Sequence, residues 1–267
     1  MIRTAPIAIM ALAAAAVLPA AAQAATSLEQ AVHSDARSAK FTARDAVRHP
    51  DQELDFFGLR PNATVVEIAP GGGYWSEILA PYLAARGSLY EVLPAGGPDA
   101  DKEAKPFHAL VAAKPAMFAK IHITGLGKDH YDIAPPASAD FVLTFRNVHN
   151  WMYDGYADQA FAAFFKTLKP GGILGVEEHR GLATKPQDPK AEDGYVRQDY
   201  TIALAKKAGF ELVGSSEINA NPRDTKEYPQ GVWTLPPVFA LGDKDHAKYA
   251  AIGEADNFVL KFRKPAQ

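Results

Sequence analysis

The chain has no cysteine, which excludes a disulfide bond and a lipid-modified N-terminal cysteine. It also has no basic excess: 28 Lys and Arg stand against 31 Asp and Glu, with a pI near 6.2. Nucleic-acid binding domains usually carry a marked positive charge. Beyond the first 24 residues there is no second long hydrophobic run. We therefore expect no nucleic-acid partner and no stable membrane anchor in the mature protein.

The first 24 residues have the pattern of a secretory signal peptide. A single early cation, Arg3, precedes an apolar stretch over residues 7–22, and Ala22-Gln23-Ala24 has the small-x-small form of a cleavage site. The alternative is a buried alanine-rich helix. We predict that the chain is cleaved after Ala24 and that the mature protein is periplasmic or secreted.

The remaining chain alternates strand-like and helix-like segments. Continuous apolar runs suit strands buried on both faces of a parallel sheet, and stripes with helical spacing separate them. This alternation predicts an α/β fold with a doubly wound, mostly parallel sheet. The expected strands are Thr64–Ala69, Leu89–Leu93, Lys120–Thr124, Ala139–Phe145, Ile173–Val176, Phe210–Ser215 and Asn257–Arg263.

Two segments flank or interrupt the predicted sheet. Residues 25–60 read as a helical N-terminal extension to the domain over residues 61–267. Residues 216–255, ahead of the last strand, are rich in Pro, Asn and Asp, with Trp233 isolated among prolines. Long connections inside compact domains are usually functional, so we predict a lid here.

The most informative segment is Val65–Trp75, where an apolar run ends in an acidic residue, Glu67, and the chain passes through Gly71, Gly72 and Gly73 into an amphipathic helix. Glycine lets a ligand approach the main chain closely, and a helix start offers unpaired N–H groups. The segment predicts a nucleotide-like cofactor. A dinucleotide-binding fingerprint would need a third spaced glycine where Ser76 stands.

The segment Glu67-x-Ala69-x-Gly71-x-Gly73 instead resembles the glycine loop of class I S-adenosylmethionine-dependent methyltransferases, with Ala69 in place of the first glycine. Asp140–Leu143 and Leu168–Leu174 resemble the fourth strand and the turn into the fifth strand of that family. The resemblance implies a Rossmann-like methyltransferase fold with a seven-stranded sheet, and S-adenosylmethionine as cofactor.

Longer motifs narrow the resemblance to predicted exported (periplasmic) bacterial methyltransferases. They are Glu67–Leu83, Phe145–Trp151, Glu177–Arg180 and Asp193–Val196, and the likeness runs from about Arg44 to Arg263. This family implies the cofactor and leaves the methyl acceptor undefined.

Ligands of open α/β sheets bind beyond the carboxyl ends of the strands, near the switch in strand order. We expect the motif residues after the first, fourth and fifth core strands to lie there. In class I methyltransferases an acidic residue usually ends the second strand and binds the ribose; Leu93 holds that position here, and Glu91 is the nearest substitute or else a solvated edge charge. The predicted cofactor-binding residues are Glu67, Ala69, Gly71, Gly72, Gly73, Glu91 and Arg146.

Methyl transfer to oxygen or to a protonated nitrogen needs a base. His149 is the first candidate, with Asn147 as a second catalytic residue; a structural role is the alternative for His149. We predict no metal, because the spacing of His149, Glu178 and His179 is no recognised ligand motif. The predicted acceptor-binding residues are Asn150, Trp151, Glu178, His179, Arg180 and Tyr195, and Trp233 is a further pocket candidate. A core role is the alternative for Trp151, Tyr195 and Trp233.

The sequence thus leaves two functions open. One is methyl transfer from S-adenosylmethionine to a small-molecule or peptide-like acceptor outside the cytoplasm. The other is non-catalytic binding of a periplasmic ligand on a methyltransferase-like fold, which the missing acid at Leu93 favours. The oligomeric state is not predicted.

Overall fold

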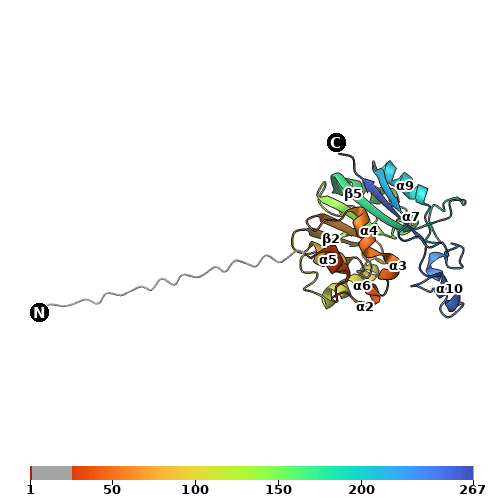
Figure 1. Cartoon of the computed structure of the whole chain (residues 1–267). Coiled ribbons are helices and arrows are strands. Elements are labelled where there is room, and N and C mark those ends of the chain that lie inside the picture. The colour runs from red at the N-terminus through yellow and green to blue at the C-terminus, as the bar shows by residue number, and fades with distance from the viewer. Residues whose placement is uncertain (2–25, 267) are drawn as a thin grey trace.

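The computed structural model describes Met1 and residues 26–266, and the predicted signal peptide therefore lies almost wholly outside the described residues. A seven-stranded sheet forms the centre, in the order β3-β2-β1-β4-β5-β7-β6 (Figure 1). All neighbours are parallel except β7, which is antiparallel to both β5 and β6. The strands are β1 (Thr64–Ile68), β2 (Ser88–Pro94), β3 (His122–Leu126), β4 (Ala139–Phe145), β5 (Leu168–His179), β6 (Glu211–Ser216) and β7 (Asn257–Arg263).

Adjacent residues of β1 face opposite sides of the sheet and belong to different cores. Val65 packs with α1 (Leu28–Val32), α4 (Pro50–Phe57) and α5 (Ser76–Leu83), whereas Val66 packs on the side of α7 (Val148–Tyr153), α8 (Ala157–Thr167) and α9 (Gln198–Lys207). Helices thus cover both faces, as the predicted doubly wound sheet requires. The other helices are α2 (Ala39–Thr42), α3 (Asp45–Arg48), α6 (Ala100–Ala113), the 3-10 helix η1 (Gly231–Thr234) and α10 (His246–Ile252).

Two strands differ from their expected bounds by more than one residue. β3 is displaced by two residues, because His122 is the first residue to pair with β2, opposite Tyr90. β5 extends well beyond Ile173–Val176 at both ends. Its last residues pair with antiparallel β7, with Glu177 opposite Val259 and His179 opposite Asn257. Glu177–His179 therefore lie inside a strand, and not in the loop after it.

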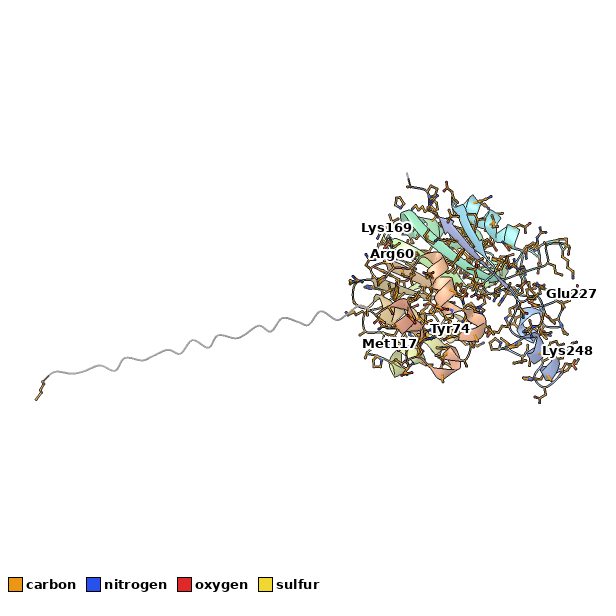
Figure 2. All side chains as sticks on the ribbon, viewed as in Figure 1. Arg60, Tyr74, Met117, Lys169, Glu227 and Lys248 are labelled. Atoms are coloured by element: carbon orange, nitrogen blue, oxygen red, sulfur yellow. The ribbon has the colours of Figure 1, made fainter. Side chains whose placement is uncertain are left out.

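The segment over residues 216–255 contains η1 and α10 and has a small core of its own. Its buried Val232, Leu235 and Tyr249 pack with Tyr195. Figure 1 shows α10, in blue, lying apart from the sheet, and Figure 2 shows Glu227 and Lys248 at the outer edge of this part of the molecule. In the part of the chain described, no helix is both long enough and apolar enough to span a membrane.

Candidate active site

The strand order reverses between β1 and β4, and the glycine turn lies at that switch point. Ala69, which directly follows β1, has a φ of 49°, the left-handed region that favours glycine. Its N–H donates to the carbonyl of Val92 on the next strand at 2.8 Å, which holds this conformation. Ala69 stands where the glycine loop of class I methyltransferases has its first glycine, and its backbone has a conformation typical of glycine.

The three glycines differ in what surrounds them. A Cβ on Gly71, whose φ is 58°, would have no described heavy atom within 4 Å, so this residue borders open space. A Cβ on Gly73, whose φ is 89°, would lie 2.2 Å from the Leu110 side chain on α6. Gly71 thus leaves room for a ligand, whereas Gly73 allows close packing of the turn against a helix.

Two cavities adjoin this turn. The first, of about 370 Å³, extends from Gly71 and Gly72 to His149, His179 and Trp233. The second, of about 310 Å³, lies beyond the end of β2 and is lined by Leu93 and Pro94. Both have the size of small-molecule sites. They share three lining residues, Ala69, Asn147 and Asn150.

Asn147 occupies the boundary between the cavities. Its side-chain amide donates to the Ile68 carbonyl and to the Thr144 hydroxyl, each at 3.1 Å. These bonds tie the end of β4 to the end of β1. The preceding residue, Arg146, has a φ of 63° and donates its N–H to the Glu177 carbonyl at 2.7 Å. A strained turn thus directs this segment over the strand ends.

Glu67 lies at the base of the first cavity, where its carboxylate accepts a hydrogen bond from the Ser76 hydroxyl at 2.9 Å. Burial raises the pKa of Glu67 to about 7, and burial beside Glu67 also raises the pKa of Glu91. The two carboxyls are opposite one another on β1 and β2. Glu91 is fully buried and lines neither cavity, so the structure does not place it as the predicted ribose ligand.

Three arginines line the first cavity. Arg44 makes a bidentate pair with Glu254, at 2.7 and 2.6 Å. Arg146 lies 3.5 Å from the same carboxylate and 3.7 Å from that of Glu177. The pKa of Glu254 is lowered: burial would raise it, but the hydrogen bond and charge of Arg44 outweigh burial.

Arg48 is the third arginine, and it is 3% exposed. Its guanidinium lies 4.0 Å from the Tyr74 ring centroid and 5.2 Å from that of Trp75. Its Nη2 forms an ion pair with the buried Glu177 carboxylate at 3.5 Å, and its Nε has no hydrogen-bond partner among the described residues. Burial and the nearby Arg146 lower the pKa of Arg48 to about 10. A buried guanidinium that keeps one unsatisfied N–H at a cavity wall suits an anionic ligand group.

His149 and His179 lie at the opposite end of the first cavity. His149 Nδ1 is 3.0 Å from the Glu178 carboxylate, and His179 Nδ1 is 2.7 Å from the Asn257 amide oxygen. Burial would raise the pKa of Glu178, but the charge of His149 and its hydrogen bond lower it. Burial lowers the pKa of His179 to about 3, so this imidazole is neutral at ordinary pH.

Most of the predicted site residues meet at these cavities. Trp151 lines the second cavity and packs its ring 5.3 Å from Phe164 in the core, rather than lining the acceptor end. The predicted site residues that line the first cavity are Glu67, Ala69, Gly71, Gly72, Arg146, Asn147, His149, Asn150 and His179.

Three predicted acceptor-binding residues line neither cavity. Glu178 is fully buried beneath His149. Arg180 is paired with Glu217 and, at 3.2 Å, with Asp256. The Tyr195 hydroxyl donates to Asp224 at 3.1 Å. Their polar groups bind neighbouring protein groups, so they support the site from outside.

Other lining residues were not predicted. Arg44 and Arg48 are spaced as neighbours on one helical face, a signal that the sequence did offer. No local pattern marks Glu254, which reaches the cavity through the fold of the 216–255 segment. In the second cavity Asp99 and Glu103, around the start of α6, supply the acidity missing at Leu93. The unpredicted lining residues include Phe41, Arg44, Arg48, Tyr74, Trp75, Asp99, Glu103, Tyr156 and Glu254.

Several solved structures have a fold similar to that of this chain. A SAM-dependent methyltransferase from Aquifex aeolicus is 13% identical, with a TM-score of 0.57 over 83% of this chain and 93% of its own. The 1,6-didemethyltoxoflavin-N1-methyltransferase of Burkholderia thailandensis, solved with S-adenosylhomocysteine, is 14% identical, with a TM-score of 0.51 over 85% and 81%. The [4+2]-cyclase SpnF is 17% identical, with a TM-score of 0.57 over 83% and 82%.

No protein-family model matches the sequence, and no curated protein matches it either. Similarity at these identities shows architecture, and the presence of a cyclase among the neighbours shows that architecture alone does not fix the reaction. The predicted fold class is confirmed: the chain has the seven-stranded, Rossmann-like fold of class I S-adenosylmethionine-dependent methyltransferases.

Proposed function

We propose that this protein is an exported enzyme that transfers a methyl group from S-adenosylmethionine to a small-molecule or peptide-like acceptor. The observation that carries the proposal is the pair of cavities that share Ala69, Asn147 and Asn150 at the switch point of the sheet. An elongated ligand can pass from one cavity to the other over this boundary. Neighbouring structures with the same fold include named methyltransferases, which supports the proposal.

The residues present fit the two ends of S-adenosylmethionine. The second cavity, with apolar Leu93 and acidic Asp99 and Glu103, suits an adenine and the hydroxyls of a ribose. In the first cavity the Nε–H of Arg48, which has no partner among the described residues, suits the carboxylate of the methionine part. The space beside Gly71 admits its main chain.

S-adenosylmethionine supplies an electrophilic methyl group on a sulfonium sulfur. Asn147 and Asn150, at the boundary of the cavities, would orient the donor and acceptor, since in-line displacement depends strongly on alignment. His149 would accept the acceptor's proton at Nε2, because its Nδ1–H donates to the ionised Glu178. Glu178 acts through His149 and is a positioning residue. Trp233, whose ring centroid is 6.0 Å from that of His149, would bound the acceptor.

The first 24 residues support export. Their charge, apolar stretch and cleavage site have the signal-peptide pattern, although they fall outside the described residues. N-terminal sequencing of the protein from a periplasmic fraction tests this part of the proposal. A chain that begins at residue 25 is expected, and an uncleaved chain found only in the cytosol would contradict export.

Calorimetric titration of the mature protein with S-adenosylmethionine and S-adenosylhomocysteine tests the donor. Saturable binding of both is expected, at one site per chain. If neither binds at millimolar concentration, the proposed enzyme function is wrong. Binding without methyl transfer to a broad panel of hydroxyl, amine and thiol acceptors would favour the second function, ligand binding without catalysis, to which Leu93 at the end of β2 points.

A further inference from the structure

His149 and His179 form a pair at the acceptor end of the first cavity. His149 lies in the first turn of α7 and is 6% exposed, and His179 is the last residue of β5. Their ring centroids are 5.5 Å apart, with an angle of 33° between the ring planes. Two imidazoles that come from different elements thus lie side by side at one wall.

Each imidazole uses the same nitrogen to bind the protein. His149 Nδ1 is 3.0 Å from Glu178 Oε1, and His179 Nδ1 is 2.7 Å from Asn257 Oδ1. An ionised carboxylate and an amide oxygen are acceptors, so both Nδ1 atoms carry hydrogen, and in the neutral form of each ring Nε2 is the nitrogen with a free lone pair. Histidines that bind metals are held in this way, with the second ring nitrogen donating to an oxygen.

Glu178 completes the cluster from behind. Its carboxylate also accepts hydrogen bonds from the backbone N–H groups of His149 and His179, at 3.2 and 2.7 Å. Potential ligand atoms of the three residues all lie within 4.8 Å of one another. Because Glu178 is fully buried and already accepts three hydrogen bonds, it orients the histidines rather than facing the cavity.

We propose that a divalent transition-metal ion of the zinc type binds His149 and His179 through Nε2, at the acceptor end of the first cavity. Two imidazole ligands favour zinc, cobalt or nickel over magnesium and calcium, which prefer oxygen. The other coordination positions face the cavity and are open to water or to an oxygen of the acceptor. This departs from the sequence-based prediction of no metal.

The site goes beyond the proposed methyl transfer, since metal binding requires no donor. It also bears on that function. An ion on His149 Nε2 occupies the lone pair that would take the acceptor's proton. Activation by a base and activation by coordination to the metal are therefore alternatives at this site.

Titration of chelator-treated mature protein with zinc chloride tests the site, and cobalt chloride provides a spectroscopic readout. We expect one ion per chain and visible cobalt bands typical of nitrogen coordination. His149→Ala and His179→Ala should each weaken zinc binding at least tenfold, and Glu178→Gln should weaken it about 10- to 100-fold. The matched control is His108→Ala, because His108 is exposed on α6 and lines neither of the two cavities.

Circular dichroism and thermal unfolding establish that each variant is folded, and His179→Asn gives a milder replacement if the alanine variant is unstable. Equal zinc binding by the wild type and by both folded histidine variants would overturn the proposal, as would absence of zinc binding at 1 mM. Titration of His179→Ala with S-adenosylmethionine separates the two proposals. Loss of zinc with retained donor binding supports the metal site, and failure of the wild type to bind the donor contradicts only the proposed function.

Discussion

The Glu178 carboxylate accepts a hydrogen bond from the Nδ1–H of His149 at 3.0 Å and a second from the His149 backbone N–H at 3.2 Å. One buried side chain thus fixes both the position of the helix start and the orientation of its imidazole. The partner comes from β5, 29 residues later in the chain. Its effect on function can be separated from its effect on stability.

Replacement of Glu178 with Gln removes the charge behind His149 and keeps the shape. We expect kcat to fall by about 10²-fold, the usual contribution of a positioned base, with the Kd for S-adenosylmethionine unchanged. Rapid assays with an identified acceptor measure the former, and calorimetry measures the latter. Glu178→Asp should restore part of the rate. Glu211→Gln, at an exposed position on β6, is the control. Equal losses of kcat and donor affinity would point to a purely structural role.

Replacement of Gly71 with Val places a side chain in the space beside the turn. Gly242 is the matched control, because its φ of 59° is nearly that of Gly71, and its Cβ likewise would meet no described atom within 4 Å. Both variants should lose about 1 to 2 kcal/mol of unfolding free energy from the left-handed backbone. Only Gly71→Val should lose donor affinity, by at least 100-fold. Similar donor affinities in both variants would show that the donor does not bind beside Gly71.

Replacement of Gly73 with Ala should act on stability instead. The new Cβ would lie 2.2 Å from Leu110 Cδ2, in addition to the strain of a φ of 89°. We expect a loss of about 3 kcal/mol in chemical denaturation. Leu110→Ala removes the clashing atom, so the double variant should lose less than the sum of the two single variants. Strict additivity would show that the clash is absent.

The Glu67–Glu91 pair predicts a particular pH dependence. The folded-state pKa of Glu67 is about 7 against an ordinary 4.5, and that of Glu91 is raised in the same direction by burial and by Glu67. The folded state therefore retains protons that the unfolded state has lost. The contribution of the pair is most favourable below pH 4.5 and diminishes as the pH rises through 7.

Glu91→Gln keeps the second site neutral at every pH. Relative to the wild type, its unfolding free energy should rise between pH 5 and pH 8, because the wild type loses the favourable contribution of its retained protons over this range. Urea denaturation of the variant and the wild type at pH 5 and pH 8 measures the difference between their unfolding free energies. The contributions of other titratable groups cancel in this difference. A difference that does not change with pH would show that Glu91 is not held protonated in the folded protein.

Trp233 is 37% exposed and bounds the end of the first cavity. Trp233→Ala should raise the KM for the acceptor about tenfold, which corresponds to ~1.4 kcal/mol, and leave the Kd of the donor unchanged. Val213→Ala, at an exposed apolar position on β6, should change neither. An unchanged acceptor KM would show that the acceptor does not contact this segment.

The alternation of apolar runs predicted the sheet, because parallel strands covered by helices on both faces are apolar along their whole length. The same reasoning understated β5. Glu177, Glu178 and His179 appear polar and loop-like in sequence, yet they pair with β7 throughout. Burial of these charges depends on partners from distant segments, such as Asn219 for Glu177. No local pattern reports such partners.

The site shows the same division. Strand ends and glycines are local features, and most of the residues predicted from them meet at the cavities. Glu91 illustrates what local patterns cannot give: alternation assigns the face on which it lies, but its burial against Glu67 depends on the pairing of β1 with β2. Arg44 and Glu254 likewise contact one another across 210 residues of chain.

That pair joins α2–α3 to the end of the 216–255 segment at the wall of the first cavity. The two parts of the chain that sequence comparison would trim as an extension and an insertion are therefore halves of one wall. A fragment cut at the boundaries of the sheet would keep the glycine turn and lose Phe41, Arg44 and Arg48 from the wall of that cavity. The smallest unit able to retain a ligand extends at least from Phe41 to Ala255, the first and last residues lining that cavity.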